Sequence, residues 1–166
     1  MSSTLARFEL NGAALEGDAR TSYVDLRAQI GALEGRYIQN LNEDTTSLVF
    51  SAAELEGCRP SFLSTLRREG DSYIVTMKPP DVQGVLLTAE HEETRRRVIR
   101  ARDGRCSDSN GKVLKELLGV RARASRLAGA SSHAELRLKG TLAGTVDRVE
   151  SLLYVLPCRL LVSDNV

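Results

Sequence analysis

Apolar residues recur at helical spacing in the first long segment of the chain, residues 19–42. They fall three or four positions apart at Tyr23, Leu26, Ile30, Leu33, Tyr37 and Leu41. This spacing predicts a helix with one apolar stripe. Gly31 and Gly35 lie inside it, and each costs up to about 1 kcal/mol relative to Ala, so packing must hold the helix.

Short segments separated by turn residues follow this helix. Residues 47–50 and 72–78 are rich in β-branched and aromatic side chains, and they predict two strands that pair as a small antiparallel ribbon leaning on helices. Ser51 and Glu54 fit a capping box that opens a short helix ending at Gly57. Residues 61–68 predict another short helix.

The second half of the chain has helical spacing again. We expect Thr88 to cap a helix running to about residue 102, and residues 110–128 to form a helix with an apolar stripe bordered by basic residues. Ser132 and Glu135 form a second capping box, and Thr145 starts a last helix. Periodicity is lost at Pro157, so residues 154–166 are predicted to be a divergent, irregular tail.

These elements predict a mainly α fold: a helical scaffold with one small antiparallel β ribbon, part of a larger helical fold. Aromatic residues make up 4% of the chain and Trp is absent, so the core must come from aliphatic side chains, which favours packed helices. We expect residues 1–153 to form one helical segment and residues 154–166 the tail.

Charge and cysteine content narrow the functional classes. The net charge of +1 gives no global attraction to nucleic acid or anionic membrane. No apolar stretch is long enough to span a bilayer, and the first residues lack a secretory signal. Cys58, Cys106 and Cys158 are far apart and are expected to be reduced thiols. We therefore expect a cytoplasmic protein with no nucleic-acid or membrane partner.

The two histidines do not predict a metal site. His91 begins a sequence that resembles HExxH, in which two histidines bind zinc, but position 95 is Arg, and a guanidinium cannot bind zinc. His91 is interpreted as a surface residue in a first helical turn. His133 begins a capped helix without candidate partners. We therefore expect no catalytic, cofactor-binding or metal-binding residue in this chain.

An arginine-rich run is the strongest charge feature, and it comprises Arg95, Arg96, Arg97, Arg100, Arg102 and Arg105. Acidic residues precede it, which fits the helix dipole and one-turn ion pairs. A nucleic-acid role would need interleaved aromatics or a docking motif, and neither is present. A structural or interface role is favoured.

Several sequence blocks, in one order, resemble the thimet oligopeptidase and neurolysin family. Residues 39–55 (QNLNEDTTSLVFSAAEL) resemble its K-N-L-N-E-D-T-T-F-L-x-F-x-x-x-E-L stretch. Further blocks are similar at residues 62–66 (FLSTL), 73–80 (YIVTMKPP), 93–97 (ETRRR), 105–106 (RC), 114–121 (LKELLGVR) and 125–135 (SRLAGASSHAE). The resemblance covers about residues 11–153, with departures at Ala130, Leu136, Gly140 and Gly144.

This resemblance implies two largely helical halves around a deep channel that admits short peptides. It also implies a zinc metalloendopeptidase whose HExxH motif and later glutamate ligand lie downstream, outside this sequence. We therefore expect an amino-proximal fragment that supplies channel wall and scaffold and is inactive alone, with zinc belonging to the full-length family. Exposed apolar helix faces would favour self-association. The alternative is a non-catalytic helical binding module that uses its arginine-rich helix on an acidic partner.

Overall fold

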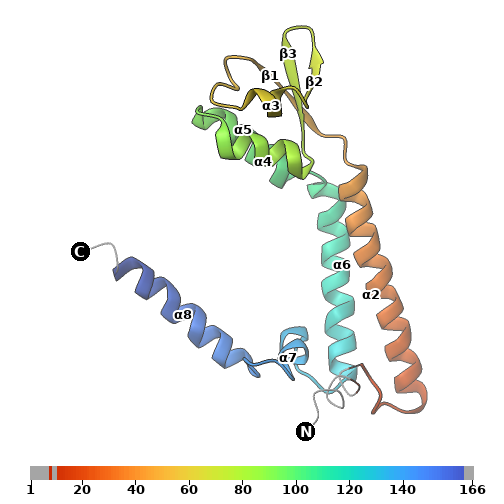
Figure 1. Cartoon of the computed structure of the whole chain (residues 1–166). Coiled ribbons are helices and arrows are strands. Elements are labelled where there is room, and N and C mark those ends of the chain that lie inside the picture. The colour runs from red at the N-terminus through yellow and green to blue at the C-terminus, as the bar shows by residue number, and fades with distance from the viewer. Residues whose placement is uncertain (1–7, 9–10, 163–166) are drawn as a thin grey trace. The chain divides into compact units, whose positions relative to one another are not determined.

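The computed structural model describes residues 8 and 11–162, with side chains as far as Val155. It confirms a mainly α fold with a small antiparallel sheet (Figure 1). Contacts divide the chain into two compact units. Unit 1 takes residues up to Arg36 and from Val113 onward, and unit 2 takes residues 37–112. The long helices α2 (Gly17–Glu43) and α6 (Ser107–Leu127) contribute to both units.

Unit 2 contains a three-stranded antiparallel sheet in the order β1-β3-β2, made of β1 (Ser47–Ser51), β2 (Arg67–Glu69) and β3 (Ser72–Thr76). The two predicted strands are confirmed. The third strand corrects the predicted two-stranded ribbon, because Arg67 and Arg68 were assigned to the helix expected over residues 61–68. All three β2 side chains are exposed, so its sequence lacks the apolar alternation of a half-buried strand, and pairing with β3 alone defines it.

The helices of unit 2 are α3 (Pro60–Leu63), α4 (Pro79–Thr88) and α5 (Glu92–Gly104). Two expectations are corrected here. Residues 52–57 form turns instead of a short helix, and Thr88 ends α4 instead of capping α5, its hydroxyl donating to the Gly84 carbonyl at 2.5 Å. Proline at the first helical positions has a suitable φ and needs no donor, so α4 starts at residue 79.

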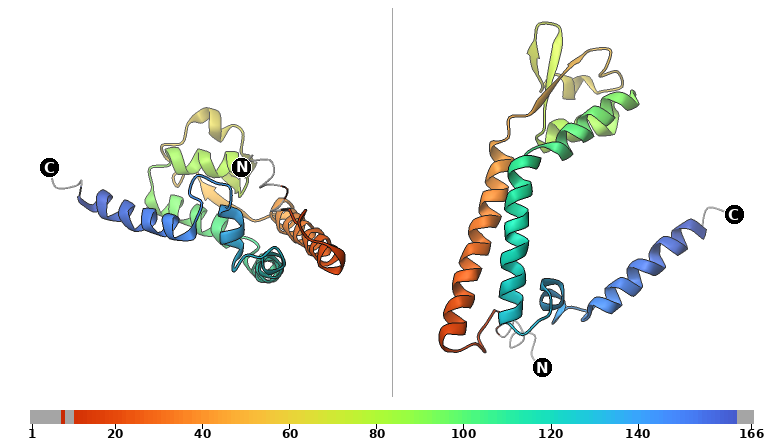
Figure 2. Two further views of the ribbon diagram at one scale, coloured as in Figure 1. Left: turned by 90° about the horizontal axis from the view of Figure 1, so that it is seen from below. Right: turned by 180° about the vertical axis from the view of Figure 1, so that it is seen from behind.

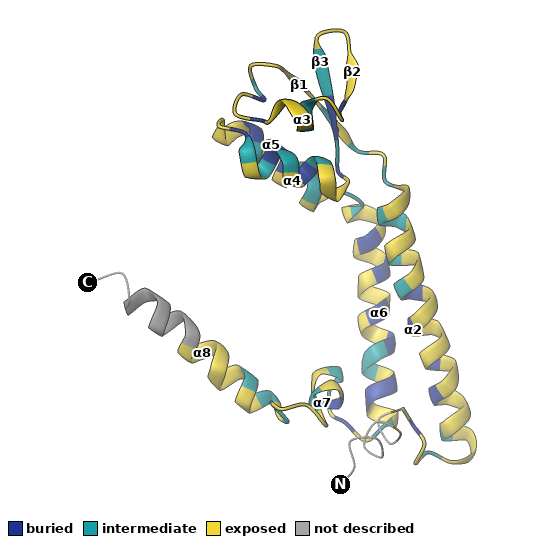
Figure 3. Cartoon of the chain, viewed as in Figure 1, coloured by how far each residue is buried: buried dark blue, intermediate teal, exposed yellow. Residues whose placement is uncertain are grey.

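The core of unit 2 lies between the sheet and the inner faces of α4 and α5 (Figure 3). Its innermost side chains are essentially inaccessible: Phe50, Leu55, Val75, Val85 and Val98. They come from β1, the following turn, β3, α4 and α5, so every element of the sequence between residues 47 and 104 except α3 and β2 contributes one of them. The small sheet is stable because helices cover it.

Unit 1 contains the larger parts of α2 and α6, which run antiparallel side by side, followed by α7 (His133–Leu138) and α8 (Val146–Val162) (Figures 1 and 2). The predicted stripe of α2 is confirmed, with Tyr23, Leu26, Ile30 and Leu33 buried. Its α6 counterparts are Val113, Leu117, Val120 and Ala124. The Ser132 cap is also confirmed, because its Oγ accepts the Glu135 amide at 3.1 Å.

The predicted irregular tail needs correction where the structure describes it. Helix α8 continues through Pro157 to Val162, whereas residues 163–166 lie outside the described part. A proline removes one backbone donor, and the leucine-rich neighbours have high helix propensity. None of the described helices is long and apolar enough to cross a membrane.

Candidate functional site

The family-like segment at residues 93–97 lies in α5, against the turn that follows β1. Thr94 is buried, and its Oγ1 donates a hydrogen bond to the main-chain carbonyl of Glu54 at 2.8 Å. The Glu90 amide, just before α5, donates to the Glu56 carbonyl at 2.9 Å. These bonds connect the turn to the start of α5. They also provide donors for the main-chain carbonyls of Glu54 and Glu56, which lie outside any helix.

Arg97 joins the same turn through its guanidinium. Its Nη1 lies 2.6 Å from Glu54 Oε1, its Nη2 lies 3.4 Å from the Val49 carbonyl, and its Cζ lies 4.5 Å from the centre of the Phe50 ring. The Ser51 amide donates to Glu54 Oε2 at 2.8 Å. Hydrogen bonds from Ser51 and Arg97 lower the pKa of Glu54, which is therefore ionised at neutral pH.

The neighbouring arginines also have acceptors within the chain. Arg95 donates to the carbonyl oxygens of Ala89 and Glu90, just after α4. Arg96 pairs with two glutamates one turn earlier on its own helix, and Arg105 donates to the Met77 carbonyl at 2.9 Å. These contacts support the structural interpretation of the arginine-rich run.

His91 and Arg95 occupy the positions of the two histidines in HExxH. His91 precedes α5, its side chain is 52% exposed, and its Nε2 lies 3.4 Å from a carboxylate oxygen of Glu56. The Arg95 guanidinium has no lone pair to donate, so these residues do not fit a zinc ion. Within the described residues, no group of three or more His, Cys, Asp or Glu side chains is arranged to hold a metal.

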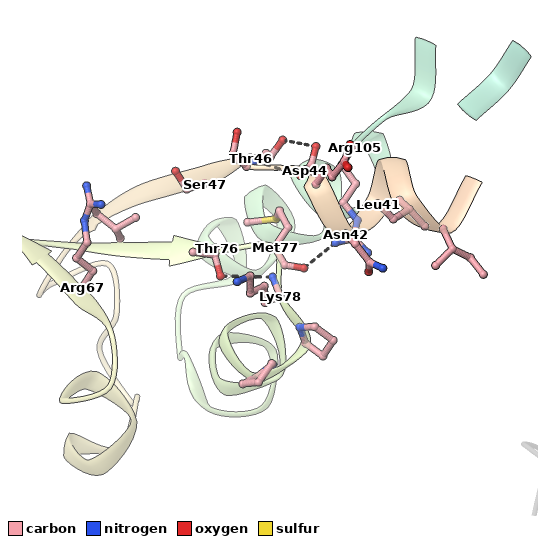
Figure 4. Close-up of a pocket in the computed structure, with 16 residues that line it drawn as sticks. Leu41, Asn42, Asp44, Thr46, Ser47, Arg67, Thr76, Met77, Lys78 and Arg105 are labelled. Atoms are coloured by element: carbon pink, nitrogen blue, oxygen red, sulfur yellow. Dashed lines mark hydrogen bonds between the residues drawn. The ribbon is translucent and has the colours of Figure 1, made fainter. Parts of the chain in front are cut away.

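A groove of about 740 Å³ opens in unit 2 where α2 ends and β3 leads into α4 (Figure 4). Asp44 accepts the amide and the hydroxyl of Thr46, both at 3.1 Å. Arg105 is bonded to the carbonyl of Met77, and Lys78 is exposed. The groove is large enough for a short ligand, but its lining contains neither His nor Cys.

Cys106 follows Arg105 and has a left-handed backbone, with φ of 55°. Its thiol lies 3.2 Å from the Asn40 carbonyl and 3.5 Å from Asp44 Oδ2. Burial and the Asp44 carboxylate raise the pKa of the Cys106 thiol. It is therefore a weak nucleophile at neutral pH.

Unit 1 brings His133 close to α6. Its Nδ1 lies 3.4 Å from Oγ of the buried Ser125, and the nearby Arg121 forms a 2.6 Å ion pair with Glu34 of α2. His133 was expected to begin a capped helix without candidate partners, and the structure places it against α6. Sequence reasoning missed the surrounding pocket, although the seven-residue spacing of Arg27 and Glu34 places both on one helical face.

No protein-family model matches the chain. Among curated proteins, "Probable thimet oligopeptidase" of Arabidopsis thaliana is 34% identical over 143 residues, which cover 86% of this chain and 20% of the relative. "Mitochondrial intermediate peptidase" of Phaeosphaeria nodorum is 27% identical over 151 residues (91% and 18%). "Oligopeptidase A" of Escherichia coli is 27% identical over 165 residues (90% and 24%).

These relatives are all peptidases, and the chain is related to them along most of its length. The chain belongs to the thimet oligopeptidase family, so the relationship predicted from the sequence blocks is confirmed. The chain spans about a fifth of the length of the curated relatives it matches.

Proposed function

We propose that this chain is a non-catalytic segment of a zinc metalloendopeptidase of the thimet oligopeptidase type, in which it supplies scaffold and part of the wall of a channel for short peptides. The observation that carries the proposal is that residues 93–97 of α5, which resemble the family, contact other parts of the fold. Thr94 and Arg97 bind the turn at Glu54, so this segment stabilises the fold.

Zinc, in this proposal, is bound by residues of the full-length protein that this sequence does not contain. When bound there, it would activate a water molecule for attack on a peptide carbonyl. The present residues do not fit the metal, because Arg95 stands where HExxH has its second histidine and its guanidinium binds carbonyl oxygens. This chain alone is therefore proposed to be inactive.

The proposal that this chain alone is inactive is tested with the purified full chain, a quenched short peptide and added zinc. We expect no cleavage under conditions in which a full-length oligopeptidase cleaves the peptide. Cleavage by this chain that a chelator abolishes would refute the proposal.

The proposed scaffold role needs a separate experiment, which uses a chimera of the Arabidopsis thaliana relative. In this chimera, residues 11–153 of the present chain replace the segment of the relative that they match. We expect the chimera to fold cooperatively and to cleave short peptides. A folded chimera without peptide cleavage would contradict a scaffold role for this segment.

The alternative function, binding of an acidic partner through the arginine-rich helix, is less well supported by the contacts. Arg95, Arg96 and Arg97 each bind an acceptor within the chain, and a partner would have to compete with these. Salt-sensitive binding to an acidic protein or a nucleic acid, lost when the three are replaced by Ala, would favour the alternative.

We propose the cytoplasm as the compartment and short peptides as the substrates of the full-length protein. One relative is named as a mitochondrial peptidase, so fractionation of cells producing the tagged chain is a direct test. Recovery of the chain with mitochondria would refute the cytoplasmic assignment.

A further inference from the structure

A small polar pocket of about 300 Å³ lies within unit 1, where α2, α6 and α7 meet. Its charged and titratable lining consists of Arg27, Glu34, Arg121, His133 and Arg137. Three guanidiniums therefore face a single carboxylate, and Arg121 pairs with it at 2.6 Å. The Arg121–Glu34 pair is the one ion pair among the described residues that line the pocket. The guanidiniums of Arg27 and Arg137 therefore have no carboxylate partner in the lining.

The contacts of His133 define its hydrogen positions. Ser125 Oγ donates its proton to the Arg121 carbonyl at 2.7 Å. Ser125 Oγ can therefore only accept from His133 Nδ1, which lies 3.4 Å away. The neutral imidazole then carries its proton on Nδ1 and leaves the Nε2 lone pair available. Burial first, and then the charges of Arg121 and Arg137, lower the pKa of His133.

We propose that the pocket formed by Arg27, Arg121, Arg137 and His133 binds a compact oxyanion, either a phosphate group or a carboxylate. Guanidiniums present pairs of N–H donors that match the oxygen spacing of both groups. Glu34 neutralises one of the three positive charges, and the remaining excess favours an anion. This inference is independent of the proposed peptidase role.

Binding of the anion is coupled to a proton. The charged groups that face His133 are Arg27 and Glu34 from α2, Arg121 from α6 and Arg137 from its own helix. Burial and the three guanidiniums lower the pKa of the His133 imidazole, and the carboxylate of Glu34 opposes them. An anion in the pocket offsets the guanidinium charges and favours protonated His133. The anion therefore binds more tightly at pH 6 than at pH 8.

The test is a titration of the full chain with sulfate at constant ionic strength, followed through the side-chain NMR signals of the arginines and His133. Sulfate keeps its charge between pH 6 and pH 8, so any pH dependence belongs to the protein. We expect saturable shifts, and at least a tenfold weaker affinity in the double variant Arg27→Ala/Arg137→Ala. The matched control is Arg20→Ala/Arg36→Ala, which removes two arginines from the same unit outside the pocket and leaves the affinity unchanged.

Two further variants separate binding from general electrostatics. Glu34→Gln releases Arg121 and is expected to raise the sulfate affinity several-fold. His133→Gln is expected to remove the pH dependence. Phosphate, and acetyl-dialanine compared with its amide, then distinguish a phosphate ligand from a carboxylate ligand. Shifts that do not saturate, or an equal loss of affinity in the two double-arginine variants, would overturn the proposal.

Discussion

Arg97 and Glu54 form a 2.6 Å ion pair across 43 residues of sequence. This pair covers the outer edge of the sheet. The Met77 amide donates to the Thr46 carbonyl, so alternate residues of β1 direct their main-chain polar groups away from β3. Arg97 binds the outward carbonyl of Val49, and the Glu54 carboxylate binds the outward amide of Ser51. Polar groups that could pair with another chain are thereby occupied.

Arg97→Ala is predicted to lower the free energy of unfolding by about 1 kcal/mol, because it removes a partly exposed ion pair and a cation–π contact. Arg96→Ala is the matched control, because Arg96 pairs with two glutamates on its own helix. This variant is expected to lower the free energy of unfolding by less than about 0.5 kcal/mol. Urea denaturation measures both. Equal effects in the two variants would contradict a specific role for Arg97.

Thr94→Val is predicted to destabilise the protein by about 1–3 kcal/mol. The substitution keeps the shape of the buried side chain but leaves the Glu54 carbonyl without its 2.8 Å donor. Thr94→Ser keeps the hydroxyl and is expected to cost less. A Thr94→Val variant as stable as the wild type would contradict a role for this hydrogen bond.

Stability at acid pH is predicted to depend on Glu54. Its pKa is lower in the folded chain than in the unfolded one, where a glutamate has a pKa of about 4.3. The ionised carboxylate therefore stabilises the fold above that value, and this contribution disappears as the pH falls through the lower folded pKa. The stability difference between the wild type and Glu54→Gln should shrink from pH 6 to pH 3. A constant difference over this range would contradict the prediction.

Two glycines in helices are predicted to respond in opposite ways to Ala. A Cβ on Gly84 of α4 would overlap the Phe62 ring, so Gly84→Ala should destabilise the fold by about 1–3 kcal/mol. Nothing lies within 4 Å of the corresponding position at Gly35 of α2. Gly35→Ala should therefore stabilise the chain by about 0.5–1 kcal/mol. Thermal unfolding of the two variants distinguishes them, and a stabilising Gly84→Ala would show that this packing is wrong.

Self-association of the isolated chain is predicted from exposed leucines on α6. Leu114 is 42% and Leu118 is 55% exposed, although both lie in the segment, residues 110–128, that was predicted to carry an apolar stripe. Sedimentation should reveal oligomers, and a hydrophobic dye should bind the wild-type chain. The double variant Leu114→Lys/Leu118→Lys should reduce both signals. A monodisperse wild-type chain without dye binding would contradict this expectation.

Local sequence patterns predicted the elements whose residues interact with near neighbours. The α2 stripe, the Ser132 cap and strands β1 and β3 are confirmed because spacing and capping act over a few residues. The same reasoning failed at β2 and at Thr88. Strand β2 depends on a partner strand for its hydrogen bonds, and Thr88 could equally begin one helix or end another.

The amino-acid sequence by itself determined the mainly helical fold class, the family relationship and the mismatch at Arg95, because these depend on side-chain chemistry and order along the chain. Only the tertiary structure decided that Arg97 binds Glu54, that Leu114 and Leu118 of α6 are exposed, and that Arg27, Arg121, Arg137 and His133 share one pocket. Contacts between residues 40 to 110 positions apart depend on how helices and strands pack, and no local periodicity encodes them.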